Sequence, residues 1–347
     1  MTSRRYVVVS PCRDEEDLVG ITLAAVAAQT ERPTAWVIVD DGSTDDTPRI
    51  VAEFAARHDW VTVITRPQRQ ARVLGSGVVE AFEAGLATID LSEVDYLVKL
   101  DVDLDLPPTY FARLMDLMEA DDRLASVSGI ACTRVDGHLE PERGSFEMTV
   151  GMSKFYRVEA FEDIGGFARM LMWDGIDCHT ARSRGWKARA VDEPELRFEH
   201  LRPMGSSDRG ILRGKRRHGR GQYLMGTHPA FLLASVAARL GDEPRVLGAL
   251  NVLAGYTRAA LTREERHPDR AMRSQMRRFQ LETLALGKER AVHRWEDRAA
   301  DLREQGAVRP VGDQAPVRSA FSRDPGRSPA QRPGRRSRRT LSDRSGR

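Results

Sequence analysis

The stretch from Tyr96 to Pro108 constrains the fold of this chain more than any other feature of the sequence. Tyr96–Leu100 is apolar enough for one buried strand, and Asp101, Asp103 and Asp105 then alternate with apolar residues. On an extended segment alternate residues share a face, so the three carboxylates would repel one another unless a cation lies among them. Oxygen ligands of this kind suit Mg²⁺ or Mn²⁺. The stretch therefore predicts either a metal site or a solvated acidic turn after a buried strand.

Apolar runs and helical segments alternate through residues 6–120. The runs predict strands at Tyr6–Ser10, Trp36–Val39, Val61–Thr65 and Tyr96–Leu100, and helices at Leu18–Ala28, Thr47–His58, Gly75–Leu86 and Tyr110–Ala120. This alternation is typical of a mainly parallel α/β sheet that is flanked by helices. Proline has no N–H to donate, so Pro107 and Pro108 end the fourth strand. Ser43, Thr44 and Thr109 are candidate helix caps.

Two acidic clusters fall where such a sheet binds ligands, beyond the carboxyl ends of its strands. Asp40 and Asp41 follow the second strand, whereas Asp101 and Asp103 follow the fourth. We therefore expect the two clusters to belong to one site.

The pattern changes after residue 120. We expect further extended segments at residues 124–130, 147–156 and 187–191, the last at a sheet edge, and another that ends at His200. A tight turn is expected at residues 164–167, and residues 172–177 are expected to lead into a helix that ends at Gly185.

The segment Arg209–Arg220 is densely basic and contains several glycines. We interpret it as a mobile loop that closes over a diphosphate or meets another anionic group, because glycine lets the backbone approach phosphate closely. A solvated charged loop is the alternative. Further candidates for phosphate contact are Arg66, Arg69 and Arg72.

Two apolar blocks, Phe231–Leu240 and Val246–Leu261, each fall short of the roughly 18–20 uninterrupted apolar residues of a spanning helix. They predict amphipathic helices that lie on a bilayer surface, or that pack against the catalytic domain or a second copy. A strongly charged helical segment, Glu264–Arg303, follows.

The net charge of +3 conceals a basic tail, since residues 309–347 hold eleven Arg against three Asp. The tail has almost no large apolar residues and is expected to be disordered and solubilising, with an anionic membrane as a second partner and no specific nucleic acid. Three scattered cysteines and the absence of a signal sequence predict a cytoplasmic protein with reduced thiols, located at the inner face of the plasma membrane.

Several motifs together resemble family 2 glycosyltransferases. VIVDDGSTDD at residues 37–46 resembles the opening of that family, and Asp101-Val102-Asp103 resembles its DxD motif. GGF at residues 165–167, WDGID at 173–177 and RSRGW at 182–186 resemble its acceptor-side block. The resemblance covers about residues 6–200 and implies a GT-A fold, a nucleotide-sugar donor, a divalent metal and inversion at the anomeric carbon.

The resemblance also implies roles for individual residues. Asp40 or Asp41 would accept a hydrogen bond from the uracil imide N–H of a UDP-sugar. Asp103 with Asp101 would hold Mn²⁺ or Mg²⁺, and His200 either completes the metal shell or is structural. The other residues assigned to the nucleotide sugar are Pro11, Arg13, Glu15, Arg72 and Val102.

The family pattern places the general base just before the acceptor-side helix. Counting back from Gly185 and Trp186, that position is Asp174, and Asp177 is the reserve candidate on nearly the same helix face. The preceding residue departs from the pattern, because Trp173 stands where the family usually has an acid. A tryptophan there is expected to stack on a sugar of the acceptor.

The sequence thus predicts a metal-dependent, inverting, hexosyltransferase-like enzyme acting on an unknown lipid-linked or polysaccharide acceptor. Its expected parts are a catalytic domain over residues 1–205, divided near residue 105, a basic gating loop (206–227), a helical region (228–303) and a tail (304–347). The rivals are a sugar nucleotidyltransferase and a non-catalytic protein that binds membranes or polyanions. The first is disfavoured because Pro11–Glu16, directly after the first strand, contains no glycine.

Overall fold

The computed structural model describes residues 4–67, 75–142, 144–202, 210–241 and 244–304. The contacts divide the chain into two units, Met1–Gln314 and Ala315–Arg347, and the second lies wholly outside the described residues. Arg69, Arg72, Arg209 and the basic tail are also outside them, so the expectations for these residues stay predictions.

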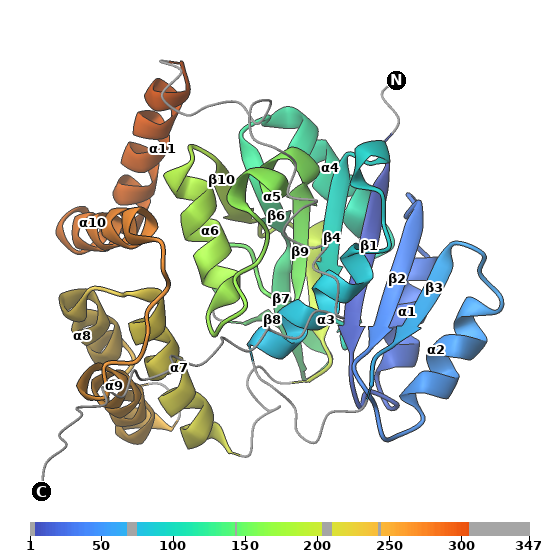
Figure 1. The fold of residues 1–347 in the computed structure, drawn as a ribbon, viewed down its shortest axis with the longest axis horizontal. Coiled ribbons are helices and arrows are strands. Elements are labelled where there is room, and N and C mark those ends of the chain that lie inside the picture. The colour runs from blue at the N-terminus through green and yellow to red at the C-terminus, as the bar shows by residue number, and fades with distance from the viewer. Residues whose placement is uncertain (1–3, 68–74, 143, 203–209, 242–243, 305–347) are drawn as a thin grey trace, which may run out of the picture. The chain divides into compact units, whose positions relative to one another are not determined.

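A seven-stranded mixed sheet forms the centre of the first unit, with the strand order β10-β6-β9-β4-β1-β2-β3 (Figure 1). Its strands are β1 (Tyr6–Cys12), β2 (Ala35–Asp40), β3 (Val61–Thr65), β4 (Tyr96–Leu100), β6 (Leu124–Ser128), β9 (Ser153–Arg157) and β10 (Lys187–Ala190). All neighbouring pairs are parallel except those that β9 makes with β4 and β6. The predicted mainly parallel α/β sheet is confirmed, and β10 lies at its edge as expected.

A second, four-stranded sheet lies beyond the end of β4. Its order is β5-β11-β7-β8, with β5 (Leu104–Asp105), β7 (Ile130–Val135), β8 (His138–Pro141) and β11 (Arg197–His200). The short strand β5 carries the chain out of the acidic stretch, and it pairs with β11 so that Leu104 lies opposite His200. This pairing brings two segments that are far apart in sequence to the same end of the large sheet.

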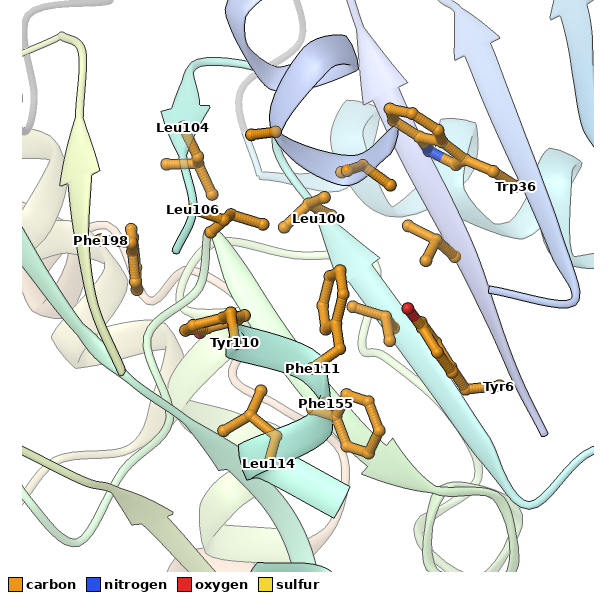
Figure 2. Close-up of a cluster of buried hydrophobic side chains, with 14 of the residues drawn as sticks. Tyr6, Trp36, Leu100, Leu104, Leu106, Tyr110, Phe111, Leu114, Phe155 and Phe198 are labelled. Carbon is orange, nitrogen blue, oxygen red and sulfur yellow. The ribbon is translucent and has the colours of Figure 1, made fainter. Parts of the chain in front are cut away.

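Apolar residues on alternate positions of the central strands form two cores, one on each face of the sheet. Val8, Ile38 and Val98 face a core completed by α1 (Val19–Ala27), α2 (Thr47–Ala55) and α4 (Tyr110–Ala120). In Figure 2, Phe111 and Leu114 of α4 point toward Phe155, and Tyr6 and Trp36 lie in the same cluster. The other core is completed by α3 (Ser76–Leu86), α5 (Val158–Ile164) and α6 (Trp173–Ser183).

Two expected helix caps differ in the structure. Thr109 occupies the N-cap position of α4 without a side-chain hydrogen bond to the helix. The N-cap residue of α2 is Asp46 rather than Ser43 or Thr44, because those two side chains bond to residues of the neighbouring loops instead.

The C-terminal region of the described chain is helical. It consists of α7 (Ile211–Met225), α8 (Pro229–Ala238), α9 (Arg245–Leu261), α10 (Arg270–Leu286) and α11 (Lys288–Glu304). Among the described residues, no helix is long and apolar enough to cross a membrane.

The expectation of a basic gating loop is wrong for residues 211–225, which form α7. Of the glycines in α7, Gly219 serves helix packing rather than contact with phosphate. A Cβ on Gly219 would lie 1.8 Å from the carbonyl oxygen of Val252, and one on Gly255 would lie 1.9 Å from that of Arg216. These contacts show that α7 and α9 are antiparallel and that their backbones touch.

Gly219→Ala is therefore expected to destabilise the protein by about 1–3 kcal/mol, because the added methyl group meets backbone that cannot move without separating the helices. The matched control is Gly214→Ala in the same helix, where a Cβ meets nothing within 4 Å. That variant should be neutral or more stable by up to about 1 kcal/mol, owing to the helix propensity of alanine. Urea denaturation of both variants measures the difference, and equal midpoints would show that the helices do not pack this closely.

Candidate active site

A cleft of about 820 Å³ opens at the carboxyl ends of β1 and β4. It brings together most of the residues that the sequence singled out. Those that line it are Pro11, Arg13, Glu15, Asp41, Asp101, Val102, Asp103, Trp173, Asp174 and His200. Asp40 and Asp177 do not line it, and Arg72 is outside the described residues.

The structure distinguishes between Asp40 and Asp41. Asp40 is buried, and its Oδ1 accepts hydrogen bonds from the backbone N (3.0 Å) and the Oγ (2.6 Å) of Ser43, so it shapes the turn after β2. Asp41 lines the cleft, and its Oδ1 lies 2.6 Å from Nη1 of Arg66. Of the two candidates for the base of the nucleotide, the geometry favours Asp41.

The loop after β1 is tied to the loop after β2. The side chain of Asp14, which has a positive φ of 54°, accepts a hydrogen bond from the backbone N of Thr44 at 2.7 Å. The backbone N of Glu15 donates to Thr47 Oγ1 at 2.8 Å, and the Glu15 carboxylate pairs with Arg202 at the end of β11. Glu15 is buried and therefore braces the cleft wall rather than facing a ligand freely.

Asp101 has a cationic partner that the sequence analysis missed. The buried Lys99 donates to Asp101 Oδ1 at 2.5 Å and to the carbonyl oxygen of Gly151 at 2.8 Å. Burial raises the pKa of Asp101, and the neighbouring Asp103 adds to this, while Lys99 acts in the opposite direction. A lysine two residues before the first acid of the motif, on the same strand face, was the available signal.

Asp103 has one carboxylate oxygen without a partner. Its Oδ1 is buried and has no hydrogen-bond partner among the described residues, while Oδ2 lies 3.7 Å from Nε2 of His200. The other ring nitrogen of His200 lies 3.0 Å from Glu142 Oε1. These two carboxylates outweigh burial and raise the pKa of His200 to about 9, and His200 in turn holds the pKa of Asp103 below its usual range against the effect of burial.

These groups resemble an incomplete metal shell. In many metal sites a carboxylate binds one ring nitrogen of a histidine and so orients the other nitrogen toward the metal. Glu142 and His200 have this arrangement, with Nε2 of His200 facing Asp103. In the part of the chain that the structure describes, no three His, Cys, Asp or Glu side chains are arranged to hold a metal by themselves. The residues therefore fit a metal ion that takes its remaining ligands from a bound diphosphate and water.

Asp174 lies in the first turn of α6 and faces the cleft. Its carboxylate forms no hydrogen bond or ion pair with the residues described. The helix begins after Met172, which has a left-handed backbone (φ 66°) that is costly for a residue with a side chain. Such strained residues cluster at functional sites, and here the strain sets the start of α6 directly before Asp174.

Trp173 does not present a free ring to the cleft. The residue is 8 % exposed, and its ring packs edge-on against that of Phe167, with 4.7 Å between the ring centroids. The ammonium groups of Lys99 and Lys154 lie 5.2 and 5.8 Å from the ring centroid. The structure thus does not support stacking of Trp173 on an acceptor sugar, because its neighbours occupy the ring.

Asp177 belongs to a buried network behind the cleft. Lys154 Nζ donates to Asp177 Oδ2 at 2.7 Å, to Thr149 Oγ1 at 2.8 Å and to the carbonyl oxygen of Asp174 at 2.9 Å. Tyr156 also donates to the Asp177 carboxylate. Burial lowers the pKa of Lys154, but Asp177 more than offsets this, and the pKa is raised. Asp177 has no access to the cleft, so this geometry gives it the role of holding the start of α6.

The wall of the cleft opposite the acidic motif comes from the C-terminal helices. His218 of α7, Ser235 and Arg239 of α8 and Lys288 of α11 all line the cleft. Burial lowers the pKa of His218 to about 4, and the charge of Arg239 contributes. The sequence analysis left open that these helices pack against the catalytic domain, but it placed none of these four residues at the site, because only long-range packing brings them there.

Comparison with known proteins decides the family. The family model described as glycosyl transferase family 2 matches residues 7–172, which include the acidic motif and β1 to β9. Residues 7–172 belong to glycosyltransferase family 2. An uncharacterized protein of Mycobacterium tuberculosis is 46 % identical over 52 residues, which are 15 % of this chain and 15 % of that protein. The match thus spans only a small part of the length of this relative.

Solved structures of glycosyltransferases are similar to this family 2 chain. GalNAc-T7 with UDP, GalNAc and Mn²⁺ superposes with a TM-score of 0.51 at 12 % identity, over 76 % of this chain and 55 % of that one. A mannosyltransferase from Pyrobaculum calidifontis, in complex with GDP-Man and Mn²⁺, gives a TM-score of 0.48 at 19 % identity, over 90 % and 89 % of the two chains. The first of these likenesses shows that the fold is shared with a glycosyltransferase, as the sequence predicted.

Proposed function

We propose that this family 2 protein transfers a sugar from a nucleotide sugar, with UDP as the nucleotide, to a hydroxyl group of a lipid-linked or polysaccharide acceptor, with inversion and with the help of Mn²⁺ or Mg²⁺. The observation that carries this proposal is the cleft itself. Neither Oδ1 of Asp103 nor the Asp174 carboxylate has a hydrogen-bond partner within the described ranges of the chain, and both residues line the same cavity.

The nucleotide half of the cleft suits a UDP group. Asp41 offers a carboxylate for the imide N–H of uracil, and Pro11 and Arg13 border the place of the base and ribose. The ion pair of Asp41 with Arg66 orients the carboxylate. Asp40 supports the same turn from below and does not contact the donor.

Asp103 and His200 would hold the metal, with Asp101 beside them, and a bound Mn²⁺ or Mg²⁺ would neutralise the charge that develops on the leaving diphosphate. Lys99 keeps Asp101 in place through its short hydrogen bond. Glu142 fixes the His200 ring from behind. GalNAc-T7, whose fold is similar to that of this chain, has been solved with UDP, GalNAc and Mn²⁺.

Asp174 acts as the general base. Its carboxylate takes the proton of the acceptor hydroxyl as that oxygen attacks the anomeric carbon, and the bond from this carbon to the diphosphate oxygen breaks, so that the nucleoside diphosphate leaves with the electron pair. Attack from the side opposite the leaving group inverts the configuration. Lys154 fixes the backbone of Asp174 through its carbonyl oxygen, so the base is positioned by the buried network.

A thermal-shift experiment tests the donor and metal sites. UDP with Mn²⁺ should raise the unfolding temperature of the wild-type protein, since a ligand at 100 times its Kd stabilises by about 2.7 kcal/mol. Asp103→Asn should lose the Mn²⁺-dependent part of the shift and should unfold at a similar temperature without ligand. Asp105→Asn is the matched control, because Asp105 is exposed on β5 and outside the cleft. An undiminished shift in Asp103→Asn would remove this residue from the metal site.

A further inference from the structure

Helix α8 is apolar on all sides yet hardly buried. Its sequence, PAFLLASVAA, has a single polar residue, and Leu232 is its one buried side chain. Leu233 is 55 % exposed and faces away from the packing that holds Leu232. A helix that is apolar all round normally lies in a protein core or in a membrane. α8 therefore presents an apolar face that nothing in the described chain covers.

Helix α9, which packs against α8, extends this face. Its inner side, including Gly248, Val252 and Gly255, is buried against α7 and α8. Its outer side carries Val246, Leu247 and Leu250, which are 53 %, 59 % and 51 % exposed. We call the exposed residues of the two helices and of the turn between them the α8–α9 surface, formed by Leu233, Leu240, Val246, Leu247 and Leu250.

The surroundings of the α8–α9 surface are basic. α7, which packs against the inner side of α9 and so lies behind the surface, has five Arg or Lys residues and no acidic residue. Arg239 and Arg245 are exposed at the facing ends of α8 and α9. Exposed apolar side chains with arginine and lysine beside them are typical of helices that lie in the interface of an anionic bilayer. The same charges would repel a second copy of this basic region, which disfavours a symmetric dimer.

We infer that the α8–α9 surface binds the surface of a bilayer that contains anionic lipids, with the leucines inserted between the head groups and Arg239 and Arg245, at the facing ends of the two helices, beside the lipid phosphates. The protein then lies on the membrane and does not span it.

The position of α8 links this surface to the cleft. Ser235, Ala238 and Arg239 of α8 line the cleft, while Leu233 of the same helix lies on the α8–α9 surface. Docking on a bilayer brings the mouth of the cleft to the lipid head groups. If the proposed transferase function holds, the acceptor is therefore carried by a membrane lipid. The lipid-carried acceptor rests on the proposed function, whereas the binding to the bilayer does not.

Co-sedimentation of the full-length protein with vesicles tests the inference without donor, metal or turnover. The wild type should bind vesicles of phosphatidylcholine with phosphatidylglycerol much more strongly than vesicles of phosphatidylcholine alone, and part of the binding should persist in high salt. The triple variant Leu233→Ser, Leu247→Ser, Leu250→Ser should bind the anionic vesicles at least about tenfold more weakly, because three apolar insertions are lost.

The matched control is the double variant Ile21→Ser, Leu281→Ser, which changes apolar residues of similar exposure on α1 and α10 and should bind as the wild type does. Equal binding of the triple variant and the wild type would overturn the inference, since charge alone would then account for the attraction. A wild type that is dimeric in light scattering, and a triple variant that is monomeric, would also overturn it in favour of a second copy. A wild-type protein that binds the anionic vesicles but transfers no sugar would count against the proposed function alone.

Discussion

Asp174→Asn is expected to lower the rate of sugar transfer by about 10²–10⁴-fold, the usual contribution of a general base. The carboxamide keeps the size of the side chain but cannot take the proton of the acceptor hydroxyl. Affinity for UDP should hardly change, because the proposed role of Asp174 is toward the acceptor hydroxyl and not toward the nucleotide. Initial rates with a saturating donor measure the loss, and a titration of UDP with Mn²⁺ provides the comparison.

The outcome for Asp174 has two informative alternatives. Transfer that stays within a few-fold of the wild type would show that another group takes the proton. Loss of UDP binding together with activity would show that Asp174 supports the donor site instead. Either conclusion requires that the Asp174→Asn variant unfolds at nearly the same temperature as the wild type. We expect this, because the Asp174 carboxylate has no partner to lose among the described residues.

Asp177→Asn should have the opposite profile, with a large loss of stability. Removing one partner of a buried ion pair typically costs about 3–5 kcal/mol, because the other charge stays buried without compensation. Here the charge left behind is that of Lys154, whose ammonium group lies 2.7 Å from the Asp177 carboxylate. Urea denaturation should show a clearly lower midpoint. Activity should fall less than in Asp174→Asn, because Asp177 affects it only through the position of the start of α6.

A double variant separates the charge effect from a simple packing defect. Lys154→Met with Asp177→Leu removes both charges and fills the space with apolar groups, which is often neutral or stabilising for buried pairs. We expect it to recover most of the stability that Asp177→Asn loses. Its activity should stay below the wild-type level, because the hydrogen bond from Lys154 to the carbonyl oxygen of Asp174 is lost. A midpoint unchanged in Asp177→Asn would show that the pair does not stabilise the fold.

The sequence was most informative about the central sheet. β3 (Val61–Thr65), β4 (Tyr96–Leu100) and α4 (Tyr110–Ala120) have the bounds that their apolar patterns predict. The two prolines come shortly before α4, but they do not end β4 as expected, because β4 ends at Leu100 and the prolines follow the short strand β5. The helix α7 was misread as a loop because its glycines weaken helix propensity, while their actual role, close contact with α9, depends on a segment about thirty residues away.

For the site, the sequence could place side chains near the cleft but could not orient them. Asp40 and Asp41 are neighbours, yet one turns inward to Ser43 and the other toward Arg66. Asp174 and Asp177 lie three residues apart on one helix, and only the position of Lys154 on β9 separates their roles. Contacts of this kind depend on tertiary packing, which residue spacing does not specify.

The central claim is that the cleft holds a nucleoside diphosphate through a metal ion at Asp103. An anomalous difference map at the manganese absorption edge, from crystals grown with UDP and Mn²⁺, tests it most directly. The account predicts one strong peak beside Asp103 and His200, with the UDP diphosphate in contact with it and the uracil near Asp41. UDP bound in the cleft with no manganese peak at Asp103, or a manganese peak away from the cleft, would contradict it.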